Sequence, residues 1–160
     1  MKDLEILLVE DSPSDVRLVR EAIREAGVSI ALSVVRDGVE AVNYLSNCEK
    51  GKSSYPGLIL LDWNLPRKNG REVLSEIKSS ARLRRIPVLV LTSSATHEDI
   101  SEAYSLNANS FITKPGDLNS YLRMIRAIDS FWGRTVTLPP EPASCLRAAA
   151  KSAGTSASPN

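Results

Sequence analysis

Short aliphatic runs alternate with longer amphipathic stretches along this chain. Five of these runs have the length and composition of β-strands, at residues 4–9, 31–35, 58–62, 86–91 and 110–113. The run at 58–62 is aliphatic without a break until it reaches Asp62, a pattern typical of a strand that is buried on both faces. Each run is followed by a stretch with apolar residues at helical spacing, so the pattern predicts five repeated strand-then-helix units.

Helix-start and helix-stop residues bound the amphipathic stretches. Ser12 and Pro13 are a typical N-cap and first-turn pair, Asp15 completes a capping-box pattern, and Gly27 is a typical C-terminal residue. Further helices are expected around residues 39–45, 70–80, 100–106 and 118–131. Strands that alternate with helices predict an α/β fold, a doubly wound five-stranded parallel sheet with helices on both faces in a three-layer sandwich.

Length and composition narrow the range of functions. At 160 residues the chain suits one domain, which we place at residues 1–133. Residues 134–160 form a C-terminal extension rich in Pro, Ala and Ser, expected to be poorly ordered. A formal charge of +1 gives no general electrostatic reason to expect nucleic acid or an anionic membrane as a partner.

Cysteine use and the amino terminus bear on localisation. Cys48 and Cys145 lack the spacing of zinc or redox sites, and His97 is the single histidine. Charged Glu10 and Asp11 come too early for a signal peptide, and no apolar run approaches the roughly 20 residues of a membrane span. We therefore expect a reduced cytoplasmic protein.

Candidate chemical groups follow four of the predicted strands. Glu10 and Asp11 follow the first strand, and Asp62 ends the third; Thr92 and Lys114 follow the fourth and fifth. Because the carboxyl ends of parallel strands meet at one edge of a sheet, these side chains should converge there.

The chemistry of this group indicates phosphoryl transfer. Neighbouring carboxylates repel unless a cation joins them, and an all-oxygen ligand set suits Mg²⁺. The carboxylate of Asp62 can act as a covalent phosphoryl acceptor, while Thr92 and Lys114 can stabilise the phosphoryl oxygens. Taken alone, Asp62 could equally be a solvated acid that begins a turn.

Four segments carry a family resemblance: "ILLVEDSPSD", "LILLDWNLPRKNG", "IPVLVLTSSA" and "FITKP". Over about residues 4–132 the chain resembles the receiver domain of two-component response regulators, which implies a flavodoxin-like sheet of order 2-1-3-4-5. The resemblance also implies that Asp62 accepts a phosphoryl group from the phosphohistidine of a sensor histidine kinase. Asp11 and Asp62 would then ligate Mg²⁺, Glu10 would act largely through water, and the backbone carbonyl of Asn64 would complete the metal shell.

The resemblance assigns further roles along the fourth and fifth strands. Thr92 and Lys114 take the positions of the family's hydroxyl and lysine, and Pro115 that of a proline whose preceding bond is usually cis. Phe111 matches an aromatic residue that changes rotamer on phosphorylation, although a plain core phenylalanine explains it equally well. Glu10 stands where a second Asp is commoner.

The finer likeness is to small stand-alone regulators of bacterial phytochrome histidine kinases. The expected function is therefore a single-domain response regulator that switches its interaction surface in phosphorelay signalling. Such a protein catalyses its own phosphorylation and slow dephosphorylation, and has no external substrate. A second apolar stripe on the last helix suggests a homodimer, with core packing as the alternative; it comprises Tyr121, Met124, Ile128 and Phe131.

Two enzyme or ligand-binding classes compete with this interpretation. Phosphatases that resemble haloacid dehalogenases also use an aspartyl nucleophile, but they need a second Asp where this chain has Asn64. Residues 51–53, Gly-Lys-Ser, superficially resemble a P-loop, yet Ser46 stands where that motif requires Gly. A dinucleotide fingerprint is missing after the first strand, where acids stand instead.

Overall fold

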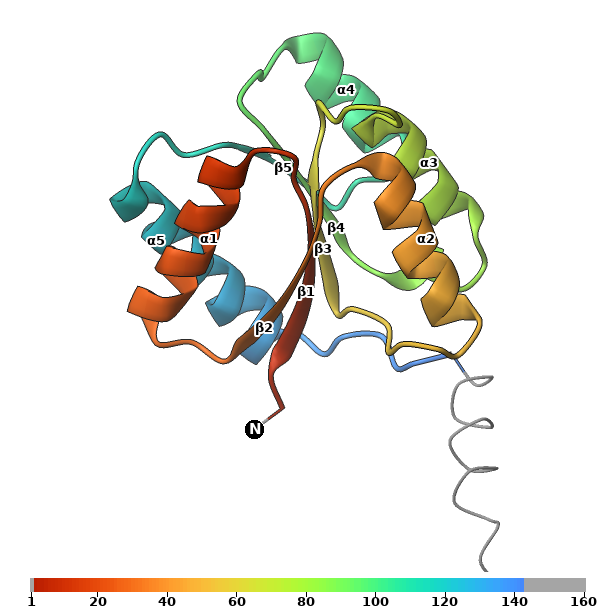
Figure 1. Cartoon of the computed structure of the whole chain (residues 1–160), viewed down its shortest axis with the longest axis horizontal. Coiled ribbons are helices and arrows are strands. Elements are labelled where there is room, and N and C mark those ends of the chain that lie inside the picture. The colour runs from red at the N-terminus through yellow and green to blue at the C-terminus, as the bar shows by residue number, and fades with distance from the viewer. Residues whose placement is uncertain (1, 143–160) are drawn as a thin grey trace, which may run out of the picture.

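The computed structural model describes residues 2–142, and their strands form one parallel sheet of order β2-β1-β3-β4-β5 (Figure 1). The strands are β1 (Leu4–Val9), β2 (Ile30–Val35), β3 (Leu58–Asp62), β4 (Val88–Thr92) and β5 (Ser110–Thr113). The helices are α1 (Pro13–Ala26), α2 (Gly38–Glu49), α3 (Gly70–Ser79), α4 (His97–Ser105) and α5 (Leu118–Ile128). The predicted α/β fold and strand order are confirmed.

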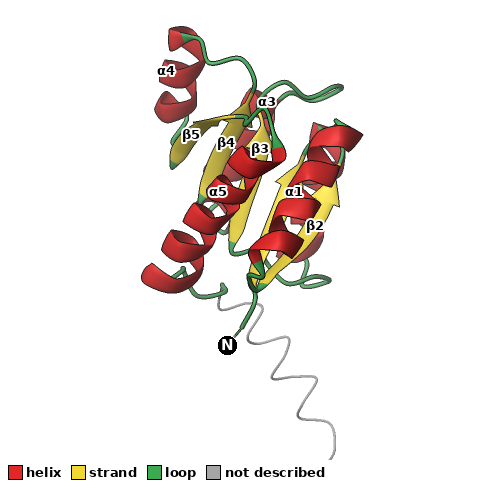
Figure 2. Ribbon diagram, turned by 90° about the vertical axis from the view of Figure 1, so that its left-hand side faces the viewer, coloured by secondary structure: helices red, strands yellow, loops and turns green. Residues whose placement is uncertain are grey.

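Helices cover both faces of the sheet. Figure 1 shows α1 and α5 on one side and α2, α3 and α4 on the other, and Figure 2 shows α1 and α5 in front of the strands. Alternate residues of β1 point to the two layers: Ile6 and Leu8 pack with α1 and α5, whereas Leu7 and Val9 pack with the opposite helices. All five residues of β3 are buried, so the sheet holds its central strand rigidly.

Two element boundaries differ from the sequence pattern. β4 begins at Val88 rather than residue 86, because Leu83–Arg85 forms a 3₁₀ turn and Pro87 has no N–H to donate to a ladder. The last helix does not stop at residue 131 as expected: α5 ends at Ile128, and the chain continues as a π-helical run, Asp129–Thr135.

The second apolar stripe of the last helix is not an exposed surface. Tyr121 and Ile128 are buried in the core that α1 and α5 share, and Met124 packs against the same core. Of the two interpretations that the sequence left open, core packing therefore holds for these residues, because the helix buries a wider face than one row of apolar residues. Phe131 alone of the four is exposed, at 50%.

Part of the C-terminal extension contacts the domain. Leu138 packs against the core cluster beneath α1 and α5, and its Cδ1 lies close to Gly57. Residues 143–160, which include Cys145, lie outside the described residues, so the domain boundary after residue 133 stays a prediction. Among residues 2–142, no helix combines the length and the hydropathy that crossing a bilayer requires.

Candidate functional site

The register of the sheet brings the candidate residues to one edge. Val9 pairs with Leu61, so Glu10, the next residue, lies level with Asp62. Asp62 pairs with Leu91 on the other side, and Thr92 pairs with Thr113, directly before Lys114. Four neighbouring strands therefore deliver their last side chains to one pocket at the carboxyl edge of the sheet.

Three carboxylates gather in this pocket. Glu10, Asp11 and Asp62 each offer an oxygen within 4.8 Å of the oxygens of the other two. Glu10 is 1% exposed and Asp62 is 3% exposed, whereas Asp11 lies at the surface. Buried anions this close repel one another unless a cation compensates them, and the donor atoms are the oxygens that Mg²⁺ prefers. The residues present therefore fit a divalent metal of that kind.

Lys114 supplies a fixed positive charge beside these acids. Its Nζ lies 2.7 Å from Glu10 Oε2 and 3.3 Å from Asp62 Oδ2. Burial alone would lower the pKa of Lys114, but the interaction with Glu10 and the negative charges of Asp62 and Glu10 outweigh it, so the pKa is raised. Lys114 is therefore a permanent cation in this pocket.

Burial disfavours the charged forms of Glu10 and Asp62. Burial raises the pKa of Glu10 to about 7, against the opposing effect of Lys114 and with a further rise from the charge of Asp62. Burial also raises the pKa of Asp62, while Lys114 and the N–H of Asn64 oppose that rise. The positive charge of Lys114 therefore does not fully compensate the negative charges of the acids. This is a second indication that the pocket suits an added cation.

The Thr92 hydroxyl is held in place from two sides. It accepts a hydrogen bond of 3.2 Å from the side-chain amide of Asn64 and another of 3.2 Å from the N–H of Ser94. The N–H of Asn64 in turn donates to Asp62 Oδ1 over 3.2 Å. Asn64 therefore links the carboxylate on β3 to the hydroxyl on β4.

The loop between β3 and α3 closes tightly over Asp62. The N–H of Gly70 donates to the carbonyl of Trp63 over 3.1 Å. A Cβ at Gly70 would lie 2.6 Å from the carbonyl oxygen of Asp62 and 2.8 Å from Cα of Trp63. Only glycine fits this close approach, which gives residue 70 a steric reason to be a glycine.

Asp15 also lies in this pocket, although the sequence pattern did not assign it there. Asp15 completes only half of the predicted capping box: its N–H donates to Ser12 Oγ over 3.3 Å, but its carboxylate turns to Lys114 Nζ, 3.0 Å away. The spacing along the chain gave no signal for this contact, because Asp11 precedes the first residue of α1 and Lys114 follows a distant strand.

A second group beside the pocket was also missed. Trp63 is completely buried and its indole N–H donates to Asp99 on α4 over 3.3 Å. The guanidinium of Arg71 lies over the indole ring and forms ion pairs with Asp99 and Glu102. These contacts join residues of β3, α3 and α4, and nothing in their spacing along the chain indicates them.

Pro115 and Phe111, on the two sides of Lys114 in the sequence, both have roles predicted from the family resemblance. The Lys114–Pro115 bond is trans, as are all peptide bonds of the described residues, so the expected cis bond was wrong. The trans isomer is the lower in energy by about 0.5–1 kcal/mol for bonds to proline, and Lys114 reaches the acids with it. Phe111 on β5 is half-buried against the core under α2, α3 and α4, a position that leaves its role as a switch a prediction.

Comparison with known proteins confirms the family that the motifs predicted. Residues 6–126 match the family model described as the response regulator receiver domain. Response regulator Rcp1 of Synechocystis sp. is 47% identical over 135 residues, which cover 84% of this chain and 92% of Rcp1.

Solved structures agree with this match. The phosphorylated cyanobacterial phytochrome response regulator RcpA gives a TM-score of 0.79 at 46% identity, covering 86% of this chain and 99% of that one. The Mn²⁺-bound form of Rcp1 gives a TM-score of 0.76 at 47% identity, covering 85% and 99%. The chain belongs to the family of response regulator receiver domains.

Proposed function

We propose that this protein is a single-domain response regulator that accepts a phosphoryl group on Asp62 and changes its interaction surface as a result. The observation that carries the proposal is the contact between Asp62 and Lys114 at the end of a fully buried strand, with Glu10 and Asp11 beside them. A rigid strand fixes the acceptor, and the lysine supplies positive charge where phosphoryl oxygens arrive.

The proposed metal ligands are oxygen atoms of the acid group. Asp11 and Asp62 would hold Mg²⁺ directly, Glu10 would act through water, and the backbone carbonyl of Asn64 would complete the set. Support comes from the carboxylate oxygens within 4.8 Å of one another and from the raised pKa values of Glu10 and Asp62. When bound, the metal supplies positive charge that lets the anionic acceptor and the phosphoryl group approach each other.

The chain's own residues account for the remaining steps. An oxygen of Asp62 attacks phosphorus, the bond from phosphorus to the donor breaks, and the donor leaves with that electron pair. Lys114 would then neutralise one phosphoryl oxygen, and the Thr92 hydroxyl would donate a hydrogen bond to another. The protein in this way catalyses its own phosphorylation, and attack by water returns Asp62 slowly to its free form, with no external substrate.

The same geometry disfavours the phosphatase alternative. That chemistry needs a general acid two residues after the nucleophile, whereas the Asn64 side chain donates its amide hydrogen to Thr92. An amide in this position holds the hydroxyl and cannot exchange a proton with a leaving group.

The proposed switch connects Thr92 to Phe111. Phosphorylation would draw the Thr92 hydroxyl away from Asn64 and Ser94 toward the phosphoryl group, which opens space for Phe111 on the neighbouring strand to change rotamer. The half-buried position of Phe111 against the core is compatible with two packing states. The surface around α4 and β5 would then change.

A sensor histidine kinase is the proposed phosphoryl donor, with a bacterial phytochrome as its sensory part. The basis is the similarity to RcpA, described as a cyanobacterial phytochrome response regulator, and to Rcp1. The test is phosphotransfer from a panel of autophosphorylated histidine kinases, phytochromes and others, at equal concentration. We expect the fastest transfer from a phytochrome kinase. Faster transfer from kinases of other input classes would contradict this choice of partner, and transfer from none would contradict the kinase-linked function.

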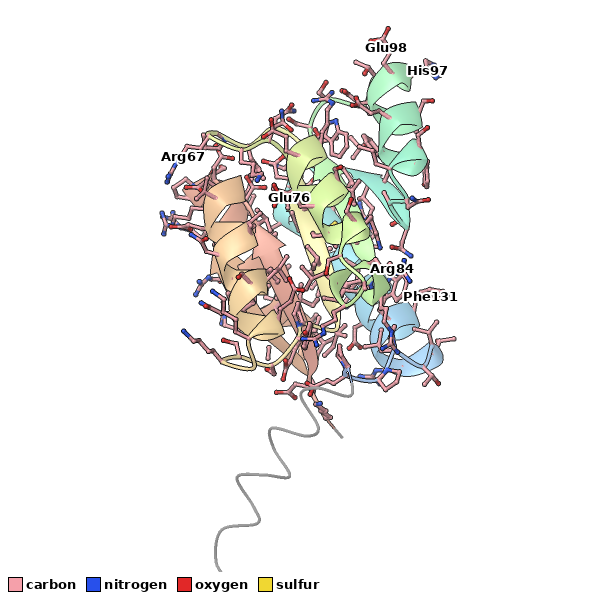
Figure 3. All side chains as sticks on the ribbon, turned by 90° about the vertical axis from the view of Figure 1, so that its right-hand side faces the viewer. Arg67, Glu76, Arg84, His97, Glu98 and Phe131 are labelled. Carbon is pink, nitrogen blue, oxygen red and sulfur yellow. The ribbon has the colours of Figure 1, made fainter. Side chains whose placement is uncertain are left out.

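A homodimer through the end of the last helix is the second part of this proposal. It rests on Phe131, which is exposed. Figure 3 shows its side chain pointing outward, at the opposite end of the molecule from Arg67. Arg67 lies in the loop that follows Asp62. Trp132 packs edge-on against Phe131 with ring centroids 5.1 Å apart, so the two rings together offer an apolar surface for a second chain.

A further inference from the structure

Lys114 divides its charge among three carboxylates, and one of them lies outside the proposed metal-binding group. Its Nζ lies 2.7 Å from Glu10 Oε2, 3.0 Å from Asp15 Oδ2 and 3.3 Å from Asp62 Oδ2. The contact with Asp15 is therefore shorter than the contact with the proposed acceptor. Asp15 does not belong to the group formed by Glu10, Asp11 and Asp62.

The fold leaves the carboxylate of Asp15 available for this contact. Asp15 lies in the first turn of α1, where its backbone N–H completes the cap on Ser12. Its side chain has no part in that cap, and only 27% of it is exposed. The neighbouring Tyr121 is buried, and burial followed by the negative charge of Asp15 raises the pKa of its phenol to about 12. Asp15 on α1 is therefore partly shielded from solvent, close to Tyr121 of α5 and to Lys114.

We propose that Asp15 is a positioning residue that competes with Asp62 for the Lys114 ammonium and so slows phosphoryl uptake. The inference rests on the proposed function of Asp62 as the acceptor. In the unphosphorylated protein, Asp15 and Glu10 make the shorter contacts with Lys114, and the acceptor makes the longest.

Charge explains why this competition acts on the reaction. When acetyl phosphate is the donor, an Asp62 oxygen bonds to phosphorus, the bond from phosphorus to the acetate oxygen breaks, and acetate leaves with the electron pair. Negative charge thus grows beside Lys114, and the ammonium has to turn from Asp15 toward a phosphoryl oxygen. The carboxylate of Asp15 holds the ammonium back and also repels the incoming anion.

The test compares rates of phosphoprotein formation with acetyl phosphate and Mg²⁺. Asp15→Asn keeps the shape of the side chain and the backbone cap while it removes the charge. We expect uptake to be faster by roughly three- to tenfold, as befits the loss of one charge from a partly solvated pocket. Asp15→Glu restores the charge and should return the rate toward that of the unmodified protein, which a purely structural role of Asp15 would not do.

Glu21→Gln is the matched control, because it removes one negative charge from the same helix at an exposed ion pair with Arg24. Its rate should stay unchanged. If Asp15→Asn does not fold, Asp15→Ser keeps the N–H of the cap and removes the same charge. An unchanged or slower rate in a folded, charge-removed variant would overturn the proposal, as would equal acceleration by Glu21→Gln. Absence of phosphorylation in the unmodified protein would instead refute the proposed function itself.

Discussion

Trp63 is the residue that follows Asp62, and the guanidinium of Arg71 lies 5.0 Å from the centre of its ring. Arg71 also forms ion pairs with Asp99 and Glu102, so α3 and α4 are joined at this point. The Trp63 indole donates to the same Asp99. Contiguous contacts therefore run from the residue after the acceptor to α4, and whether they couple the two is open to experiment.

Replacing Arg71 tests this connection. Arg71→Ala should lower the free energy of unfolding by about 1–2 kcal/mol, because it removes a cation–π contact and two partly exposed ion pairs together. Amide hydrogen exchange in α4 should also become faster. The control Arg24→Ala removes an exposed pair on α1 and should leave the stability essentially unchanged. Equal losses in the two variants would count against a specific role for Arg71.

Magnesium should stabilise the folded protein through the acid group. A ligand that binds only the folded state raises the unfolding free energy by about 2.7 kcal/mol at a hundred times its dissociation constant. Asp11 lies at the surface, so Asp11→Asn should fold normally and lose most of this increase. Thermal unfolding with and without Mg²⁺ measures it, with Glu98→Gln on α4 as the control. Undiminished stabilisation of Asp11→Asn would exclude Asp11 as a ligand.

The raised pKa of Glu10 gives the metal-free protein a definite pH dependence. Its pKa is about 7 in the folded state against 4.5 for the ordinary group, so the folded state holds the proton more tightly. The contribution of Glu10 to stability is then complete below about pH 4.5 and is lost as the pH rises through 7.

Urea unfolding of the protein and of Glu10→Gln, in the presence of a chelator, isolates this contribution. Gln has the same shape but does not titrate. As the pH rises from about 5 to about 8, past the folded-state pKa of Glu10, the unmodified protein should lose stability relative to Glu10→Gln. A difference between the two proteins that is constant over this range would refute the assigned shift.

The homodimer depends on Phe131 and can be tested against a similar residue elsewhere. Phe131→Glu should lower the assembled fraction in sedimentation while phosphorylation continues. Tyr104→Glu on α4 is the matched control, since Tyr104 is 49% exposed and Phe131 is 50% exposed. Ile128 is unsuitable for this purpose because it is buried. An unchanged sedimentation profile for Phe131→Glu would rule out a dimer through this end of the helix.

The sequence predicts the parts of the site that local pattern controls. The aliphatic run of β3 located Asp62 at a strand end, and the strand order follows from the family resemblance. The contact between Asp15 and Lys114 joins residues 99 positions apart, and it depends on where the fold places α1 and the end of β5. A pattern of neighbouring residues cannot predict a contact between positions so far apart in the sequence. The ion pairs of Arg71 with α4 are equally distant from any local pattern.

The local pattern also could not predict how wide a face of α5 is buried. Tyr121 and Ile128 fall on a stripe beside the first apolar row of α5, and the sequence leaves open whether that stripe faces solvent. The width of the buried face is set by α1 and by the sheet beneath, which the spacing within α5 does not specify.

The most direct test of the central claim is the intact mass of the protein after incubation with acetyl phosphate and Mg²⁺. The account predicts that the unmodified protein gains one phosphoryl group and that Asp62→Asn, which keeps the shape but not the nucleophilic carboxylate, gains none. A phosphoryl group retained on Asp62→Asn, or none on the unmodified protein, would contradict it.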